Sequence, residues 1–428
     1  MDHVASLQCT LCDRTYDADA FRYVCPEHDG YAGVLEVRYD YDVVRERFEA
    51  DLEAAGGGLD GVVPDQWRYR AFLPVAEDAT SVTLGEGGTP LLAAPRLSEA
   101  LGVTTLVKDD SRNPTGVLKD RASSVSMTKA LHLGRETVTC ASTGNAAASL
   151  AGYAARAGLD CRIFVPAAAP AGKLAQPLVY GADVLAVEGS YEEATALSLE
   201  ATEAYGWYNR NAAINPYQVE GKRTVGLEVA EQAAAAGVSP DWFVFSVGDG
   251  CTIAGGWKGV REFRDLGYAD DAPRMLGVQA EGASLVHDVF HGEEDPVAVA
   301  ERLAEAGGSA DTLADSIAVG QPANLVKAVR ALRESGGDAV LVSDEAILEA
   351  EALLGRTEGV YAEPAAAAPV AGVRVARERG IIGPDETVVV CVTGSGLKDT
   401  KAAGRAAGEP ISIPPDLDAV AERYGASA

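Results

Sequence analysis

The chain has 428 residues, of which 47% are hydrophobic, and its formal net charge is −28. This length and composition predict two or three domains with a core large enough for an enzyme. The excess of acids and the lack of any run of Lys and Arg argue against a nucleic-acid partner. No apolar run approaches the roughly 18 residues that cross a membrane, and no signal peptide is visible, so we expect a soluble, cytoplasmic protein with no membrane contact.

Acidic residues number 64 against 36 basic ones, and only nine of the basic residues are lysines. The acids are spread along the chain instead of forming a tail. Such a surface is typical of a halophilic protein, because high salt screens the repulsion between its charges. The alternative is an ordinary acidic protein.

Three of the seven cysteines fall within the first 25 residues. Cys9 and Cys12 form a C-x2-C pair, and Cys25 and His28 form a second pair with the same spacing. Paired knuckles of this kind predict a tetrahedral structural zinc site of three thiolates and one imidazole. We expect it in a zinc-ribbon-like module over residues 1–40, with strands at 21–24 and 34–39. The alternative is three reduced cysteines and an unrelated histidine.

Beyond this module, residues 42–72 look helical and mixed, with a flexible glycine-rich break at 56–61. From about residue 80, short apolar runs alternate with amphipathic stretches. Strands are expected at 105–108, 136–142, 161–166, 182–188, 241–247, 274–279, 338–343 and 386–393, and helices at 145–157, 191–204, 221–236, 322–335 and 344–356. This alternation predicts an α/β fold with parallel sheets covered on both faces and divided between two domains.

Ligands of open parallel sheets bind at the carboxyl ends of the strands, and three of these ends carry polar or glycine-rich loops. Residues 142–145 (STGN) open a helix, where hydroxyls and backbone amides suit a carboxylate, although ordinary N-capping uses the same residue types. Residues 248–252 (GDGCT) lack the spacing of a dinucleotide or Walker loop and suit a compact cofactor phosphate. Thr393 places a hydroxyl at the third strand end.

The segment NPTGVLKDR (113–121) follows the strand at 105–108. Pro114 disfavours helix at Asn113 and Gly116 permits a sharp turn, so we expect a helix to begin near Lys119. A lysine at the positive end of a helix has a lowered pKa, as an amine that forms a Schiff base requires. Alone, Lys119 is more simply an ordinary solvated lysine. Together with loops suited to phosphate, carboxylate and hydroxyl contacts, it predicts a pyridoxal 5'-phosphate site.

The sequence resembles the threonine synthase family, among the fold type II pyridoxal-phosphate enzymes. The resemblance spans nearly the whole chain and is carried by the motifs EGGTPL (86–91), NPTGVLKDR (113–121), ASTGN (141–145), GKLAQ (172–176), NPYQVEG (215–221), GDGCT (248–252) and TGSGLKD (393–399). It implies a fold of the tryptophan synthase β-like kind. The large cofactor-binding domain would comprise residues 41–130 and 206–428, and a small mobile domain residues 131–205.

The resemblance also implies roles for individual residues. Lys119 would form the internal aldimine and later shuttle protons, Asn145 would bind the ring hydroxyl, and Thr393 would face the ring nitrogen. The cofactor phosphate would be held by Gly248, Asp249, Gly250, Cys251 and Thr252. The substrate would contact Ser142, Thr143, Gly144 and Thr89, together with Gln218 and Arg223.

The implied reaction converts O-phosphohomoserine and water to threonine and phosphate, by γ-elimination and then β-addition, in a homodimer. The family's phosphate-binding serine and arginine are replaced here by Ala213 and Gln218, and we expect Arg223 or Lys222 to compensate. Because glutamine carries no charge, two alternatives stay open: a synthase acting on another phosphorylated amino acid such as phosphoserine, or a threonine/serine dehydratase or ammonia-lyase. A third is a dinucleotide-binding or zinc-ribbon regulatory protein without catalysis.

Overall fold

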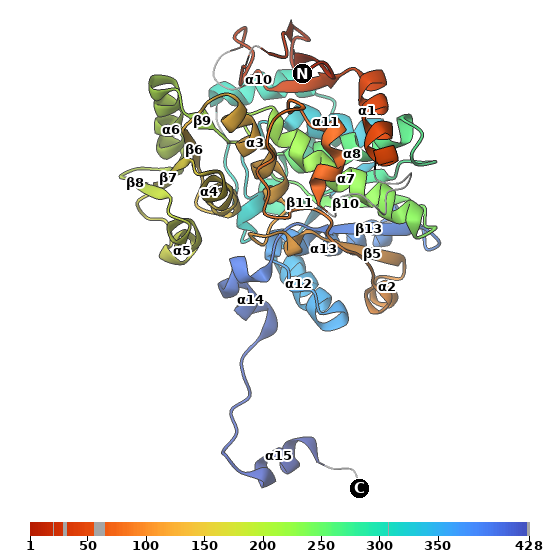
Figure 1. The fold of residues 1–428 in the computed structure, drawn as a ribbon. Coiled ribbons are helices and arrows are strands. Elements are labelled where there is room, and N and C mark those ends of the chain that lie inside the picture. The colour runs from red at the N-terminus through yellow and green to blue at the C-terminus, as the bar shows by residue number, and fades with distance from the viewer. Residues whose placement is uncertain (20, 29–31, 55–64, 307, 426–428) are drawn as a thin grey trace.

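The computed structural model describes residues 1–19, 21–28, 32–54, 65–306 and 308–425, which build three β-sheets (Figure 1). The N-terminal module lies at the top of Figure 1, a small four-stranded sheet at the left, and the largest sheet near the centre. The glycine-rich break expected at 56–61 lies outside the described residues. The expected α/β class with parallel sheets is confirmed.

The largest sheet has six strands in the order β12-β11-β10-β13-β5-β4. The strands from β12 to β5 are parallel, and β4 pairs antiparallel with β5. Their bounds are β4 (Leu91–Ala93), β5 (Thr104–Asp109), β10 (Trp242–Ser246), β11 (Arg274–Ala280), β12 (Asp338–Val342) and β13 (Thr387–Val392). The sequence did not predict β4, which is a short edge strand.

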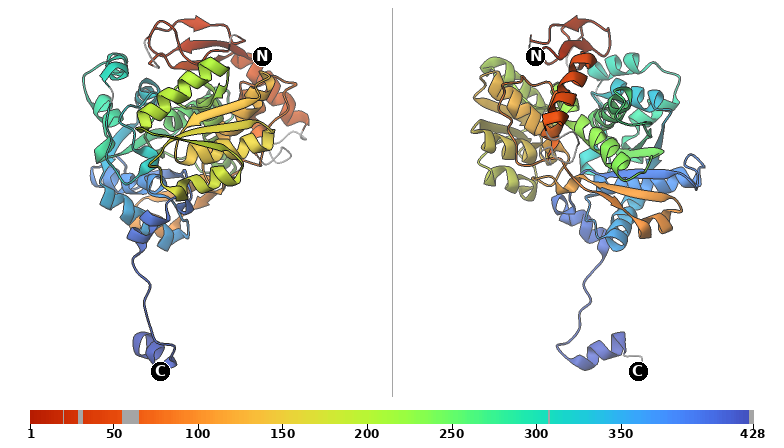
Figure 2. Two further views of the ribbon diagram at one scale, coloured as in Figure 1. Left: turned by 90° about the vertical axis from the view of Figure 1, so that its left-hand side faces the viewer. Right: turned by 45° about the vertical axis from the view of Figure 1, so that its right-hand side comes forward.

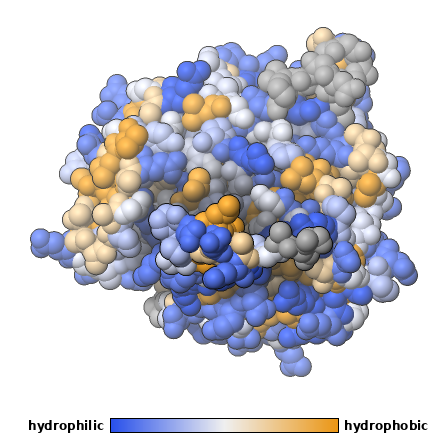
Figure 3. Space-filling view, turned by 90° about the horizontal axis from the view of Figure 1, so that it is seen from below, coloured by the Kyte–Doolittle hydropathy of each residue, from blue (hydrophilic) through white to orange (hydrophobic). Residues whose placement is uncertain are grey.

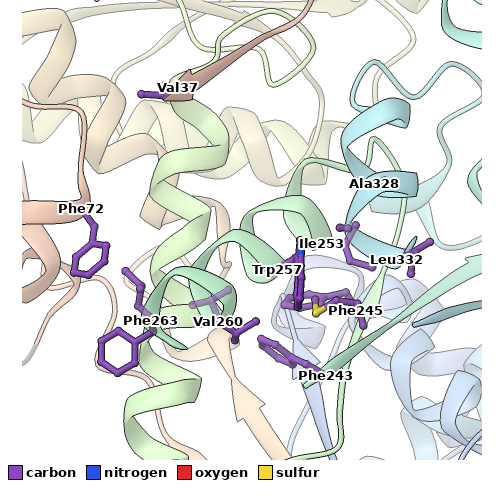
Figure 4. Packing of buried hydrophobic residues seen from close by; sticks show 14 of the residues in the cluster. Val37, Phe72, Phe243, Phe245, Ile253, Trp257, Val260, Phe263, Ala328 and Leu332 are labelled. Carbon is purple, nitrogen blue, oxygen red and sulfur yellow. The ribbon is translucent and has the colours of Figure 1, made fainter. Parts of the chain in front are cut away.

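Helices cover both faces of this sheet, as the near-continuous apolar runs of its strands predict. One face meets α7 (Tyr217–Ala235), α8 (Cys251–Asp265) and α11 (Leu325–Glu334), and the other meets α2 (Pro95–Leu101), α12 (Asp344–Glu358) and α13 (Pro364–Glu378). Successive side chains of β10 point to opposite faces: Phe243 and Phe245 lie with Trp257 of α8 (Figure 4), whereas Val244 lies in the core beside α13. Helices α9 (Leu285–His291) and α10 (Pro296–Ala306) pack beside α11.

The small sheet has four parallel strands in the order β8-β7-β6-β9. Its strands are β6 (Thr137–Ala141), β7 (Asp160–Pro166), β8 (Asp183–Val187) and β9 (Tyr208–Asn209), and its helices are α3 (Lys119–His132), α4 (Asn145–Ala157), α5 (Ala171–Val179) and α6 (Tyr191–Tyr205). Helices α3 and α4 cover one face, and α6 covers the other. Because β9 belongs to this sheet, the sheet extends just past the expected domain boundary at residue 205, and the domain boundaries stay a prediction.

All eight strands predicted beyond residue 80 are present, with ends that differ by at most one residue. The predicted helices are also present. The largest difference is at α7, which begins at Tyr217 instead of residue 221 because Pro216 precedes it and its fixed backbone φ suits a helix start.

The N-terminal module is a three-stranded antiparallel sheet of β1 (Val4–Cys9), β2 (Thr15–Tyr16) and β3 (Leu35–Tyr39), followed by α1 (Tyr41–Ala54). The strand predicted at 21–24 is wrong, because only Val24 pairs, in an isolated bridge to Val34. Two buried lysines tie β3 to the large domain: Lys258 Nζ donates to Val37 O (2.8 Å) and Lys327 Nζ donates to Leu35 O (2.7 Å).

At the other end of the chain, α14 (Thr400–Ala407) is followed by an extended segment and α15 (Leu417–Tyr424). Helix α15 has no buried residue and projects away from the rest of the molecule (Figures 1 and 2). Seen from this end, the surface is mostly hydrophilic, with apolar residues in separate patches (Figure 3). Across the described ranges, no helix is both long and apolar enough to cross a membrane.

Candidate active site

Lys119 is positioned by backbone hydrogen bonds between two strand-end segments. Leu118 N–H donates to Thr393 O (2.8 Å), and Ser395 N–H donates to Gly116 O (2.9 Å). Gly116 has a φ of +85°, in the left-handed region that favours glycine. The turn that follows β5 is therefore fixed against the turn that follows β13, and Lys119 begins α3 beside both.

The first turn of α3 is closed by Asp120. Its carboxylate accepts hydrogen bonds from Thr115 N–H (2.6 Å) and from Thr115 Oγ1 (2.5 Å). An acid in the first turn complements the positive end of the helix. Burial raises the pKa of Asp120 to about 6, against the effect of these hydrogen bonds. The residue next to Lys119 thus holds the helix start in place.

The amine of Lys119 has a lowered pKa, as the sequence predicts. Burial lowers the pKa to about 8; Glu363 opposes this effect, whereas Lys222 and Arg210 add to it. Burial is thus the largest cause of the lowered pKa of Lys119, whereas the expectation from the sequence was an effect of the positive end of the helix. With a pKa of about 8, roughly a tenth of the amine is uncharged at pH 7. Lys119 can therefore act as a nucleophile or accept a proton.

Glu363 is the carboxylate that faces this amine, and sequence reasoning missed it. It precedes α13, and both of its side-chain oxygens accept hydrogen bonds from Asn145 Nδ2 (2.7 and 3.0 Å). The same nitrogen donates to Ser316 Oγ (3.0 Å). Burial raises the pKa of Glu363, and the nearby Lys119 opposes the rise. A Glu-Pro pair is common at the start of a helix, so the sequence alone does not mark Glu363 as a site residue. Its contact with Asn145 in the folded chain does.

A pocket of about 180 Å³ opens beside Asn145 and Glu363. Its walls come from the start of α4, from α5, from residues 315–316, from the start of α13 and from residues 397–399. Two polar contacts cross its mouth: Lys173 Nζ lies 2.8 Å from Asp315 Oδ2, and Lys398 Nζ donates to Gln176 Oε1 (2.5 Å). These contacts join α5, on the small-sheet side, to Asp315 and Lys398, on the large-sheet side.

The glycine-rich loop at 248–250 connects β10 to α8. A Cβ on Gly248 would lie 2.9 Å from Ile317 Cα, and one on Gly250, where φ is +91°, would lie 2.8 Å from Asn324 O. Both positions therefore require glycine. The Asp249 carboxylate accepts hydrogen bonds from Asn324 Nδ2 (2.7 Å) and Ala323 N–H (3.1 Å), so it braces the loop from within. The start of a helix such as α8 is a favourable place for an anion, and the use of this loop for a phosphate stays a prediction.

Among the residues expected to contact substrate, Gly144 lines the pocket, as does the cofactor-binding candidate Asn145. Ser142 and Thr143 precede them and are half-buried, and Ser142 Oγ accepts a hydrogen bond from Gly144 N–H (3.2 Å). The start of α4 is thus arranged as the sequence predicts, although the use of these groups for a carboxylate stays a prediction.

The expectation for Arg223 is corrected by the structure. Its guanidinium is fully buried, pairs with Glu262 (2.6 Å) and Glu220 (3.4 Å), and lies 4.4 Å from the centre of the Tyr39 ring. Arg223 therefore fastens the N-terminal module to α7 and does not reach the pocket.

Two further residues expected to contact the substrate, Gln218 and Thr89, form hydrogen bonds away from the pocket. Gln218 is fully buried and donates to Ser126 Oγ (2.5 Å). Thr89 donates to Asp110 Oδ1 (2.6 Å) and accepts from Arg121 Nη2 (3.1 Å), within a buried ion-pair network. Neither residue lines the pocket.

The N-terminal cysteines and histidine converge as their spacing predicts. The ligand atoms of Cys9, Cys12, Cys25 and His28 all lie within 4.8 Å of one another. His28 Nε2 is buried and has no hydrogen-bond partner among the described residues, whereas its Nδ1 lies 3.4 Å from Glu301 Oε1 of α10. A carboxylate on the far nitrogen is the usual support of a metal-binding histidine. This donor set fits a tetrahedral metal ion.

The family to which the chain belongs follows from its similarity to known proteins. A family model described as pyridoxal-phosphate dependent enzyme matches residues 82–394. The chain belongs to this family. Its curated relatives include the threonine synthases of Methanocaldococcus jannaschii, 39% identical over 96% of this chain and 97% of that protein, and of Methanosarcina acetivorans, 41% identical over 97% and 98%. The threonine synthase of Mycobacterium tuberculosis is 39% identical over 83% of this chain and 94% of its own length. The resemblance to threonine synthases is thus confirmed.

Solved structures place this pyridoxal-phosphate enzyme in the expected fold type. Maize serine racemase matches with a TM-score of 0.61 and 21% identity, over 72% of this chain and 88% of that one. Diaminopropionate ammonia lyase from Escherichia coli matches with a TM-score of 0.64 and 17% identity, over 95% and 98%. At these identities the likeness establishes the fold alone.

Replacing Glu363 by glutamine tests the electrostatics of the site. Because Glu363 stabilises the ammonium form of Lys119, we expect Glu363→Gln to lower the Lys119 pKa below about 8. The measurement is the pH midpoint for reductive methylation of Lys119 in the cofactor-free protein, read by peptide mass spectrometry. Glu262→Gln, which removes a buried carboxyl that is bonded to Tyr41 and Arg223 beside the N-terminal module, is the matched control and should leave the midpoint unchanged. An unchanged or raised midpoint in Glu363→Gln would contradict this assignment.

Proposed function

We propose that this pyridoxal-phosphate enzyme is a threonine synthase, which converts O-phosphohomoserine and water to threonine and phosphate. The observation that carries the proposal is the position of the half-buried Lys119, which backbone hydrogen bonds hold where the turns after β5 and β13 meet and whose amine has a pKa lowered to about 8 by desolvation. It lies in a chain that is about 40% identical, over nearly its whole length, to threonine synthases.

The residues around Lys119 fit the cofactor. Lys119 would attach it, Asn145 and Thr393 would contact its ring, and the loop of Gly248, Asp249, Gly250, Cys251 and Thr252 would hold its phosphate at the start of α8. When bound, pyridoxal phosphate withdraws electrons from the reacting carbons of the substrate. Thr393 would offer a hydroxyl instead of a carboxylate, and this would leave the pyridine nitrogen largely neutral.

The chain itself would move the protons and orient the substrate. Lys119 Nζ, uncharged in part near neutral pH, would accept a substrate proton and return it at another carbon. Ser142 and Thr143, at the start of α4, would hold the substrate carboxylate. The cross-pocket pairs Lys173–Asp315 and Lys398–Gln176 would keep bulk water out except for the molecule consumed in the reaction.

A dehydratase or ammonia-lyase remains a second candidate, because Gln218 carries no charge and is buried, and Arg223 is paired away from the pocket. A threonine deaminase of known structure, that of T.th., also shares the fold, with a TM-score of 0.57 and 27% identity over 72% of this chain and 92% of that one. A synthase acting on another phosphorylated amino acid, such as phosphoserine, is a related alternative.

We further propose that Cys9, Cys12, Cys25 and His28 bind a structural zinc ion, with Glu301 supporting His28. All four protein ligands are present, so no open position is left for catalysis. We also propose that the protein is cytoplasmic, that it forms a homodimer and that its acidic surface is adapted to high salt.

The assay that tests the reaction compares phosphate release from O-phosphohomoserine and from phosphoserine with ketoacid release from threonine and serine. We expect threonine and phosphate to form in equal amounts from O-phosphohomoserine. Lys119→Ala should lower the rate by at least about 10²-fold, because it removes the proton-transferring amine. Ketoacid formation without phosphate turnover would contradict the synthase proposal and favour the dehydratase.

Removal of one ligand tests the metal site. We expect about one zinc ion per wild-type chain by elemental analysis, and its loss in Cys12→Ser, with lower thermal stability because the metal holds the short module together. Cys161→Ser is the matched control, since Cys161 is buried in the small-sheet core and lies outside the cluster. A wild-type chain purified without zinc, or a Cys12→Ser variant that retains it, would contradict the site.

A further inference from the structure

A small cavity lies where the N-terminal module meets the large domain, away from the candidate active site. Its volume is about 20 Å³, which is enough for one group of the size of a water molecule. Its walls come from β3, α7, α8 and α11, and the charged residues among them are Glu36, Lys258, Arg261, Lys327, Arg330 and Glu334. Four cations and two acids thus line this cavity, in a chain whose net charge is −28.

Three of the four cations have a carboxylate partner within the chain. The pairs are Lys258 with Glu220 (2.8 Å), Arg330 with Glu36 (3.0 Å) and Arg261 with Glu334 (2.9 Å). Glu36 is shared with a second arginine, Arg38 (3.0 Å), so the cluster keeps an excess of positive charge.

Lys327 of α11 is the fourth cation, and no ion pair joins it to an acid in the part of the chain that the structure describes. Its exposed fraction is 4%, and among the described residues its one hydrogen bond runs from Nζ to Leu35 O (2.7 Å). An ammonium group has three donors, so two of them are left for the cavity that Lys327 lines.

Lys108 shows how the chain otherwise buries an ammonium group. Its three donors are all satisfied, by Thr89 O (2.7 Å), Glu228 Oε2 (2.7 Å) and Gln232 Oε1 (2.9 Å). A buried charge without a counter-ion is strongly destabilising. Lys327 therefore indicates an anion that the chain itself does not provide.

The positive charge around the cavity also acts on Glu36. Burial alone would raise the pKa of this carboxyl, but the charges of Lys258, Arg38 and Arg330 lower it to about 2. Glu36 is therefore ionised at neutral pH. With its charge and that of Glu334 already counted, one positive charge at the cavity is still unmatched.

We propose that this cavity binds one halide ion, such as chloride, held by Lys327 between the N-terminal module and the large domain. One unmatched cation requires one monovalent anion, and phosphate or sulfate is too large for a space of about 20 Å³. The side chains of Arg261 and Arg330 are 26% and 31% exposed, so the ion can enter from solution on their side.

A bound halide would stabilise the contact between the two parts of the chain. Lys327 of α11 donates to Leu35 of β3, and Arg330 of α11 pairs with Glu36 of the same strand. The ion would lower the cost of burying Lys327 in this contact. A ligand that binds only the folded chain raises its stability with concentration until the site is full.

The first test follows thermal unfolding of the full chain while sodium chloride replaces sodium acetate at constant total salt. Acetate is too large for the cavity, and the constant salt keeps the screening of surface charges fixed. The matched pair of variants is Lys327→Met and Lys129→Met. Lys129 is also buried, but it lies 4.7 Å from the centre of the Tyr217 ring and does not line the cavity.

We expect chloride to raise the unfolding midpoints of the wild type and Lys129→Met by about 2 °C or more relative to that of Lys327→Met, in a saturable way. The comparison with Lys129→Met removes any general effect of the exchange of anions on stability.

The second test locates the ion in crystals grown with sodium bromide, from the anomalous scattering of bromine. We expect a bromide ion in the wild-type cavity, in contact with Lys327 Nζ, and none there in Lys327→Met. If Lys327→Met is too unstable to study, the wild-type crystal alone decides whether the cavity holds a halide.

Three results would overturn the site. One is a wild-type cavity that holds only water in the bromide crystals. Another is a bromide ion that stays in the cavity of Lys327→Met. The third is an equal chloride-dependent shift, or none, in the wild type and Lys327→Met, which would make any bromide in the crystal an adventitious ion only.

Discussion

The position of Lys119 depends on the hydrogen-bonded joint between the turns that follow β5 and β13. These strands are parallel neighbours, so both of their carboxyl ends lie at the same edge of the sheet. The bonds from Leu118 to Thr393 and from Ser395 to Gly116 then fix the start of α3 against the end of β13. A change in that strand order would separate the amine from the residues expected to contact a cofactor ring.

Two cationic side chains in the first turn of α3, those of Lys119 and Arg121, differ in the charged groups that surround them. Arg121 is enclosed by Asp110 and Glu228, and Glu228 also pairs with Lys108 (2.7 Å). This network locks α3 onto α7 and β5. Two residues earlier, Lys119 makes no ion pair with any described residue; the charge of Glu363 favours its ammonium form, and the cations Lys222 and Arg210 oppose it. Buried charges that are matched stabilise the scaffold, whereas the unmatched ones mark the place where a ligand's charge is expected.

Much of the fold could be predicted from the sequence, because buried parallel strands appear as short apolar runs between turn residues. The helix start at Lys119 and the convergence of the cysteines with His28 were also predictable, since both depend on local spacing. Strand β9 was missed because two residues carry no periodicity. Glu363 was missed because its partner Asn145 is 218 residues away.

The error at Arg223 has a geometric cause. Successive residues of a helix point about 100° apart, so a motif match that is uncertain by one position does not fix which face a side chain occupies. Lys222 packs against α8, where a Cβ on Gly255 would lie 3.1 Å from its Cβ, whereas Arg223 faces the N-terminal module, where its guanidinium lies 4.4 Å from the centre of the Tyr39 ring. Only the packing of α7 distinguishes the two.

The central claim is that Lys119 is the residue to which pyridoxal phosphate becomes attached. Borohydride reduction of the protein incubated with the cofactor, followed by peptide mass mapping, tests it directly among the nine lysines of the chain. We predict one cofactor per chain, carried by the peptide that contains Lys119. A cofactor fixed to another lysine, including the neighbouring Lys222, or no fixed cofactor at all, would contradict the account.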